Sequence, residues 1–324
     1  MNPVRPKFWI YAIFIGLLPL SPPCVHADGI EPLSVRSQSM SQFFRFDPIP
    51  IGTKVPEDGQ VQVRMAHSIA NQWGHEKRFI MDGQTQDDWL EIATGFGTNW
   101  SLGVGFGAKR VNPSYTDQIT IGFHDLFFIP QGERLAIDQN LTRMTIPEYG
   151  LEITNMNHGM GWTEHAFVRL GRRLYQQGYF HVNGGLVLAN EFSDNSLMGR
   201  GSQSYGSHLQ LSTEWTRYAF LTAIHYVRHD AVSDQAFWLR DASLSWLMAT
   251  EIEMHDWELL SQMLIQRGAA RDLGQYSRNS YELHLGLRKQ WRKLSFELTL
   301  IENVIWHFNS PDWGFALGLL YQGE

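Results

Sequence analysis

Residues 100–109 read Trp-Ser-Leu-Gly-Val-Gly-Phe-Gly-Ala-Lys, and every second residue of this stretch is apolar. A period of two is the pattern of a β-strand, because successive side chains of a strand point to opposite faces. A soluble sheet usually turns one face to a core and a polar face to water. The second face of this strand carries only Ser101, Lys109 and the three glycines between them. The stretch therefore predicts a strand whose apolar side meets lipid and whose glycine side faces the interior of a barrel.

The same alternation recurs in segments of about ten residues along the chain. A tilted strand needs about 9–11 residues to cross the hydrocarbon layer, whereas strands of globular proteins usually have about 5–6. No proline lies between Pro147 and Pro311, where these segments are densest. Proline has no backbone N–H, and an unsatisfied partner in the ladder is costly in lipid. The absence of proline from these segments is therefore expected of membrane strands. Strand length and proline placement both favour a transmembrane barrel over a soluble sandwich. The segments are 61–69, 90–97, 166–174, 180–189, 209–215, 244–253 and 294–300.

The connections between these segments alternate between short and long. Such alternation is typical of outer-membrane barrels, which have short periplasmic turns and long outer loops. It predicts an all-β fold, a transmembrane antiparallel up-and-down β-barrel of about 12 strands with both ends on the periplasmic side. Short turns are expected near 98–99, 176–177, 216–217, 253–255 and 289–293, and long loops near 71–86, 110–163, 191–206, 230–236, 267–279 and 305–312.

Two of the long loops leave choices open. The segment 110–163 could contain one more hairpin, through 119–123 and 148–154, which would give 14 strands and keep an even number. Within the loop expected at 71–86, Asp82-Gly83 is interpreted as a turn, because Asp and Gly favour turn conformations.

Aromatic residues support a membrane location. The chain has 12 tryptophans and 11 tyrosines, and many lie near the ends of the expected strands, among them Trp89, Trp100, Trp215, Trp257 and Trp291. Interfacial girdles of barrels have this composition, because the rings lie at the level of the lipid headgroups. The alternative is that these rings form the core of a periplasmic sandwich. The girdle interpretation makes outer-membrane lipids a partner of the chain.

The N-terminus predicts export. Residues 1–27 combine the cations Arg5 and Lys7, an uncharged run from Phe8 to Leu20, and a Val-His-Ala ending. This is the pattern of a cleaved signal peptide, and the apolar run is too short for a membrane-spanning helix. Three segments are then expected: a signal peptide at 1–27, a periplasmic or lumenal segment at 28–59, and an outer-membrane barrel at 60–324 with a long loop insertion at 110–163.

Composition excludes several classes of function. Cys24 is the single cysteine and lies in the expected signal peptide, so the mature chain has no thiol nucleophile or Cys-based metal site. Without Arg5 and Lys7 the formal net charge moves from −7 to −9. This acidity, with scattered cations, argues against nucleic acid as a partner. No phosphate loop, dinucleotide fingerprint or zinc-protease signature occurs, so no cofactor is expected.

The interior face of the expected barrel carries charges of both signs. They could pair across a filled lumen or line a wet one. The inward positions include Arg64, Arg169, Arg173, Glu214, Glu251, Glu253, Glu258, Gln262, Glu282, His284, Arg288 and Glu297.

Three short segments between residues 31 and 134 resemble one protein family. They are Pro32–Ser39 (Pro-Leu-Ser-Val-Arg-Ser-Gln-Ser), Met81–Thr85 (Met-Asp-Gly-Gln-Thr), and 123–134 (Phe-His-Asp-Leu-Phe-Phe-Ile-Pro-Gln-Gly-Glu-Arg). In this order after a signal sequence they are similar to the uncharacterised proteobacterial family known as domain of unknown function 3187. Ser37, Met40 and Phe128 depart from its usual residues. The resemblance implies an envelope protein with a barrel fold and brings no known activity.

Charged residues of these segments outside the regular strands are candidates for a constriction. One hypothesis is that 31–56 forms a periplasmic or lumenal segment and that 110–163 folds inward. His124, Asp125 and Arg134 would then project into the lumen, together with Arg36 and Asp82. An equally simple interpretation is that these residues fix loop geometry by hydrogen bonds. The predicted lumen or constriction residues are Arg36, Asp82, His124, Asp125, Arg134, Arg64, Arg169, Arg173, Glu251 and Glu253.

Catalytic and metal sites are poorly indicated. Barrel enzymes that act on lipid need a nucleophile or water, a histidine and an orienting group. Ser207-His208, Glu164-His165 and His124-Asp125 are the available pairs, but adjacent residues of a strand point to opposite faces. His225 and His229, four apart on a strand, are too distant to share an ion, since each residue advances roughly 3.3 Å. No catalytic residue and no metal ligand is assigned.

The sequence therefore predicts a barrel in the outer membrane of a Gram-negative bacterium. Its expected task is passive passage or binding of a small polar solute, without covalent chemistry. Two alternatives remain: a barrel enzyme that modifies envelope lipid, and a soluble periplasmic β-rich binding module.

Overall fold

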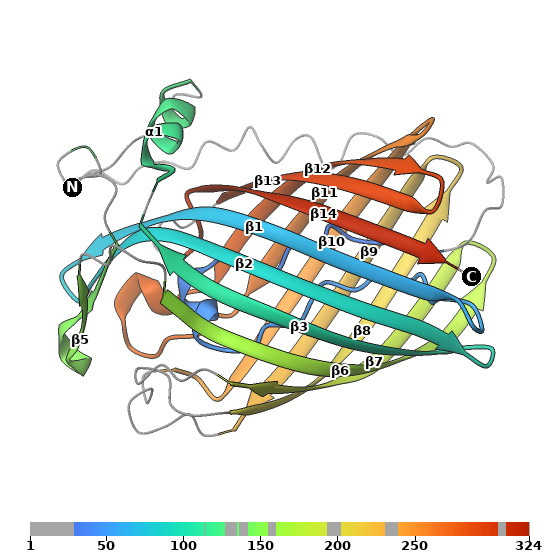
Figure 1. Ribbon diagram of the computed structural model, residues 1–324, viewed down its shortest axis with the longest axis horizontal. Helices are drawn as coiled ribbons and strands as arrows, with labels where there is room; N and C mark the ends of the chain where they lie inside the picture. Colours follow the sequence, from blue (N-terminus) through green and yellow to red (C-terminus); the bar gives the residue numbers. More distant parts are fainter. Residues whose placement is uncertain are drawn as a thin grey trace.

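Twelve strands close into one antiparallel barrel (Figure 1). The structure is a computed structural model that describes residues 29–113, 115–126, 135, 142–154, 160–192, 202–230, 239–303 and 309–323. Each strand pairs with its neighbour in the chain, and β1 pairs with both β2 and β14, which closes the cylinder. The predicted up-and-down barrel of 12 strands is confirmed.

The barrel strands are longer than the segments that alternation marked. They are β1 (Val61–Glu76), β2 (Phe79–Phe96), β3 (Trp100–Asn112), β6 (Met160–Gln177), β7 (Phe180–Glu191), β8 (Gln203–Trp215), β9 (Tyr218–His229), β10 (Ala242–Met254), β11 (Trp257–Gln266), β12 (Ser280–Trp291), β13 (Leu294–Asn303) and β14 (Trp313–Gly323).

One end of the barrel, here called the turn end, carries the short connections. They span residues 97–99, 178–179, 216–217, 255–256 and 292–293, at or next to the predicted positions. The opposite, loop end carries the long connections, of which much of 191–206, 230–236 and 305–312 falls outside the described residues.

The loop expected at 71–86 is wrong. β1 and β2 pair continuously from Val61–Thr94 to Glu76–Phe79, so the only connection between them is Lys77-Arg78. Asp82-Gly83 therefore lies inside β2 and is not a turn. Backbone pairing with β1 on one side, and with the short strand β4 (Arg143–Ile146) on the other, satisfies the ladder at this position and overrides the local turn preference.

The two faces of the wall differ as the alternation predicts. Met65, Ile92, Val104 and Leu298 each expose about half of their side chains on the outside of the barrel. At the turn end the outside carries a belt of exposed aromatic rings: Phe96, Tyr179, Trp215, Trp257, Trp291 and Tyr321. Trp89, expected in a girdle, is instead buried on the inner face. The apolar exterior excludes the two-layered soluble sandwich, which would bury these Leu and Val side chains.

Within the described part of 110–163, residues 117–126 lie outside the barrel, whereas Met144 belongs to the buried cluster of Met40 and Phe43 at the loop end. Helix α1 (Asp117–Leu126) packs against the outer face at the loop end, where Asn71 Nδ2 donates to Asp117 Oδ1 at 2.8 Å. Asn71 shares its face of β1 with the exposed Met65. The short strands β4 and β5 (Leu151–Thr154) form a hairpin that extends the end of β2 (Figure 1). The alternative of 14 barrel strands is therefore wrong, because 119–123 is helical and 151–154 pairs only with β4. Within the described residues, no helix has the length and apolar character needed to cross a membrane.

Candidate functional site in the barrel lumen

Residues 29–56, here called the plug, occupy the lumen (Figure 1). The backbone N–H of Thr53 donates to the carbonyl of Ile30 at 2.9 Å, so the two ends of the plug lie side by side. Between them the chain runs toward the loop end, forms a short 3-10 helix (Met40–Phe44), and returns. Residues 30–47 and 49–53 are all buried. The plug is thus a loop inserted into the barrel through its turn end, next to the start of β1.

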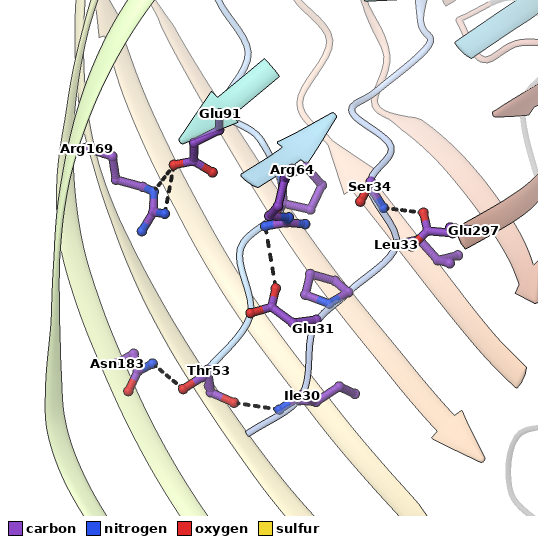
Figure 2. A network of polar contacts seen from close by, with 12 residues as sticks. Ile30, Glu31, Leu33, Ser34, Thr53, Arg64, Glu91, Arg169, Asn183 and Glu297 are labelled. Atoms are coloured by element: carbon purple, nitrogen blue, oxygen red, sulfur yellow. Dashed lines mark hydrogen bonds and ion pairs between the residues drawn. The ribbon is translucent and has the colours of Figure 1, made fainter. Parts of the chain in front are cut away.

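The glycine face of β3 gives room to side chains from its neighbours. A Cβ at Gly103 would lie 2.4 Å from the Glu91 carboxylate, and one at Gly107 would lie 2.6 Å from the His165 ring. Because these positions have no side chain, Arg169 of β6 reaches across β3 to Glu91 of β2, with Nε donating at 2.8 Å (Figure 2). The bare face of residues 100–109 therefore serves buried contacts inside the lumen.

Arg36 is the central charged contact of the plug. It is almost fully buried, and its guanidinium binds both carboxylate oxygens of Asp87 on β2, with Nε donating to Oδ2 at 2.8 Å. Its Nη1 donates to His165 Nε2 at 2.7 Å. The pair is bidentate and buried on both sides, which is the geometry in which such pairs are strongest. Arg36 therefore connects the middle of the plug to β2 and β6.

Asp47 and Arg45 of the plug belong to a second cluster of charged side chains. Gln266 donates to Asp47 at 2.6 Å, and the Lys109 ammonium donates to the carbonyls of Gln42 and Arg45 at 2.9 and 3.1 Å. Burial raises the pKa of Asp47, although Lys109 and Arg36 attract its charge. Burial also lowers the pKa of Arg45 to about 10, so this guanidinium stays charged at neutral pH.

On the opposite wall, strands β12 and β13 hold the first limb of the plug. Glu297 accepts the backbone N–H of Ser34 at 2.7 Å, and Glu282 accepts Ser37 Oγ at 2.6 Å. Arg288 donates to Glu297 at 3.0 Å and to the plug carbonyl of Glu31 at 3.0 Å. The inward carboxylates of this wall are therefore matched by backbone and side-chain donors of the plug.

Near the turn end the base of the plug makes further polar contacts. Arg64 lies 3.5 Å from the Glu31 carboxylate (Figure 2). It also donates to the carbonyl of Pro50 at 3.0 Å. Asn183 donates to the Thr53 carbonyl at 2.8 Å, and the Thr53 hydroxyl accepts from the N–H of Ile30. Side chains of β1 and β7 thus hold the base of the plug.

Apolar side chains supplement these bonds. Ile30 packs with Leu221, Leu247 and Leu264, while Leu33 and Val35 pack with Leu260, Ile301 and Ala316. At the loop end Met40, Phe43 and Phe44 join a cluster with Phe79, Met144 and Tyr276. Apart from the peptide chain that leads through residues 57–60 into β1, the described contacts between the plug and the wall are non-covalent and therefore reversible.

Leu33 fits against Gly286 so closely that the glycine offers a test of docking. A Cβ at Gly286 would lie 2.2 Å from Leu33 Cδ2, and Leu33 is fully buried. We expect Gly286→Val to weaken docking of the plug by about 1–3 kcal/mol, since overpacking a filled interior has that cost. The readout is faster chymotrypsin cleavage at the plug phenylalanines of the folded protein. Leu285→Val, one residue away on the outer face, is the matched control; equal protection of both variants would contradict this docking.

The structure distributes the predicted lumen residues unevenly. Arg36, Arg64 and Arg169 are buried inside the barrel, Arg173 and Glu251 are half-buried on the inner face, and Glu253 is exposed at the turn end. Asp82 shares its face of β2 with the exposed Leu90 and Ile92, so it points away from the lumen.

The candidates of the 123–134 segment do not reach the lumen. His124 is buried and Asp125 is exposed on α1, at the outer face of the loop end, and Arg134 lies outside the described residues. The expectation that His124 and Asp125 project into the lumen is therefore wrong, because α1 contacts Asn71 and Trp313 from outside.

Sequence reasoning missed Asp87, whose carboxylate binds Arg36, and Asp47, whose carboxylate accepts from Gln266. Asp87 lies next to the segment 71–86, which was interpreted as a loop. It is four residues from Glu91, and strand residues an even number apart point to the same face, so this spacing could have predicted an inward Asp87. Nothing periodic marks Asp47. Two of the three pairs considered for catalysis are separated by the wall: Glu164 and Ser207 point outward, while His165 and His208 point inward.

One protein family covers nearly the whole chain. A family model described as "Protein of unknown function (DUF3187)" matches residues 10–322. No curated protein matches the chain. Among solved structures, the COG4313 outer membrane channel from Pseudomonas putida F1 is similar with 13% identity and a TM-score of 0.48, over 83% of this chain and 96% of that chain.

Two porins are similar over a comparable length. The NanC porin has 11% identity and a TM-score of 0.45, over 81% of this chain and 98% of its own. The KdgM porin, solved in complex with disordered oligogalacturonate, has 8% identity and a TM-score of 0.44, over 80% of this chain and 98% of its own.

Proposed function

The chain belongs to the family described as protein of unknown function DUF3187, and because this membership assigns no activity, we propose its function from the geometry of its lumen. The protein is a plugged outer-membrane barrel that binds a small polar solute or lets it pass when the plug moves. Residues 1–27 act as a cleaved signal peptide that exports the chain. The apolar exterior and the aromatic belt of the turn end support contact with lipid.

One observation carries this function: the plug is held in a polar lumen by reversible contacts. Most hydrogen bonds between plug residues 34–53 and the wall involve charged or hydroxyl groups of the wall. Examples are Asp87, Glu282, Glu297 and Ser212. Water can replace the plug at each of these groups, because all are hydrophilic. A lumen meant to stay closed could be filled more simply by apolar side chains of the wall itself.

The enzyme alternative has less support. His165 and His208 point to the opposite face of the wall from their sequence neighbours Glu164 and Ser207, and His165 already accepts a bond from Arg36. A nucleophile, base and orienting group must lie within hydrogen-bond reach of one another.

A disulfide lock tests the proposed function. Leu33→Cys/Gly286→Cys would join the plug to β12, because the ideal Cβ of position 286 lies 3.2 Å from Leu33 Cγ. Cys24 is the only other cysteine and belongs to the expected signal peptide, so the new pair has no competitor in the mature chain. We expect proteoliposomes of the wild type to take up small sugars, the oxidised variant to exclude them, and reduction to restore uptake. Equal uptake in the oxidised and reduced states would disprove movement of the plug.

Outer-membrane location is checked on the same protein. We expect the wild type to fractionate with the outer membrane and to migrate differently on gels before and after boiling. Release from cells without detergent would contradict the proposed location.

A further inference from the structure

A polar cavity of about 470 Å³ opens beside the base of the plug at the turn end. Its walls come from the end of the plug and the start of β1, from the last residues of β6 and β14, and from the turn between β12 and β13. These parts of the chain lie far apart in sequence, and closure of the barrel brings them together. The cavity lies where a solute would enter or leave the lumen at this end.

Cations dominate the lining of this cavity. Lys54, Arg173, Arg292 and Lys293 contribute four positive charges, against the single carboxylate of Glu57. None of the four makes an ion pair with a carboxylate among the described residues. Elsewhere in the lumen, Arg36, Arg169 and Arg288 each bind a carboxylate of the chain. A net positive cavity in a chain of net charge −7 is thus an exception within its own molecule.

Arg173 is the best-placed of these cations. It lies on the inner side of β6 beside a register shift, and its Nε is buried without an acceptor. A buried guanidinium donor without a partner is costly, and an anion in the cavity would remove that cost. Its sequence neighbour Arg172 points outward and stacks over Trp100 at 4.8 Å.

Glutamine side chains complete the lining. Gln60, Gln62, Gln176 and Gln322 lie beside the cations, and an amide has both a donor and an acceptor. Gln60 already exchanges two hydrogen bonds with Glu57, at 3.0 and 3.4 Å. Such groups suit the hydroxyls of a sugar-like molecule, whereas the cations suit its charged end. Electrostatic attraction alone would bind any anion without the glutamine side chains.

We propose that this cavity binds small hydroxylated organic anions, with a carboxylate or a phosphate as the charged group. The inference rests on the proposed passage of a polar solute and names the chemical class of that solute. Arg173 and Lys54 bind the charged group, and Gln62 and Gln322 bind hydroxyls. The cavity lies on the inner side of the wall, so the ligand is a soluble anion rather than a lipid in the membrane.

Calorimetric titration of the full-length protein in detergent tests this inference without any need for transport. The probes are gluconate, inorganic phosphate and, as the neutral comparison, glucose. We expect gluconate to bind more tightly than phosphate, glucose to bind least, and added salt to weaken binding of both anions. Arg173→Gln/Lys54→Gln should weaken gluconate binding at least about tenfold, since two charge-assisted contacts are lost.

Arg172→Gln is the control for the Arg173 substitution, because it removes one charge from the adjacent residue on the opposite face. Unchanged gluconate binding in Arg172→Gln, with loss in the double variant, supports the site. Absence of gluconate and phosphate binding to the wild type, or equal weakening in both variants, would overturn it. Uptake of glucose by proteoliposomes together with absent anion binding would leave the proposed passage intact and reject only the anionic solute.

Discussion

Deletion of residues 29–53 is expected to raise the single-channel conductance in a planar bilayer at least about tenfold over the full-length protein, because a barrel of twelve strands is wide enough to hold water when nothing fills it. The deletion removes the buried loop and leaves residues 54–60 to lead into β1. The wall residues that it uncovers include Asp87, Glu282 and Glu297, which water can solvate.

Two controls accompany the deletion. The variant must keep the gel mobility of a folded barrel before boiling, which is expected because the twelve-strand ladder does not include the plug. Gly286→Val should give intermediate conductance, since it displaces Leu33 without removing the chain. A folded deletion variant with the conductance of the full-length protein would show that the plug is not the barrier.

Arg36→Ala is expected to weaken docking of the plug by about 3–5 kcal/mol, because it strands the buried Asp87 carboxylate without a partner. Both side chains of this pair are inaccessible to solvent. If opening of the plug is fast, chymotrypsin cleavage at Phe43, Phe44 and Phe46 should accelerate by more than about a hundredfold. The strands of the barrel should remain resistant, so the loss is local to the plug.

The second substitution Asp87→Ala distinguishes a specific pair from general loss of packing. In the double variant no carboxylate is stranded, so the combined loss should be clearly smaller than the sum of the two single losses. Arg172→Ala, which removes an exposed cation of β6, should leave cleavage unchanged. Additive losses in the double variant would mean that Arg36 and Asp87 contribute independently.

Much of the wall follows from local pattern. The alternation of residues 100–109 fixed which face of β3 is apolar, and the structure places Leu102, Val104 and Phe106 on the outside. The short turns near residues 98, 216 and 255 were also predicted at or next to their positions, because a hairpin turn joins two strands that are adjacent in the sequence. Local pattern gave a wrong prediction where tertiary contacts extend the strands. Asp82-Gly83 favours a turn in isolation, yet pairing with β1 and β4 holds it in a strand.

The candidate site was only partly predictable. Arg64, Arg169 and the carboxylates Glu282 and Glu297 follow from alternation, because a strand position determines the face. Arg36 was singled out by the resemblance of Pro32–Ser39 to a family segment, and the structure places that segment in the plug. His124 and Asp125 were singled out by the same resemblance, yet α1 lies outside the barrel, since no periodicity in the sequence specifies on which side of a wall a loop packs.

The sequence by itself determined that this chain forms long two-faced strands joined by short and long connections in turn, because side-chain direction in a strand depends only on neighbouring residues. Only the tertiary structure decided that residues 29–56 fill the lumen and that four cations gather at the turn end. Those contacts join groups such as Ser34 and Glu297, which are 263 residues apart, and they form only when the barrel closes. The lumen exists only once the barrel has closed, so the sequence of a single strand does not determine which residues fill it.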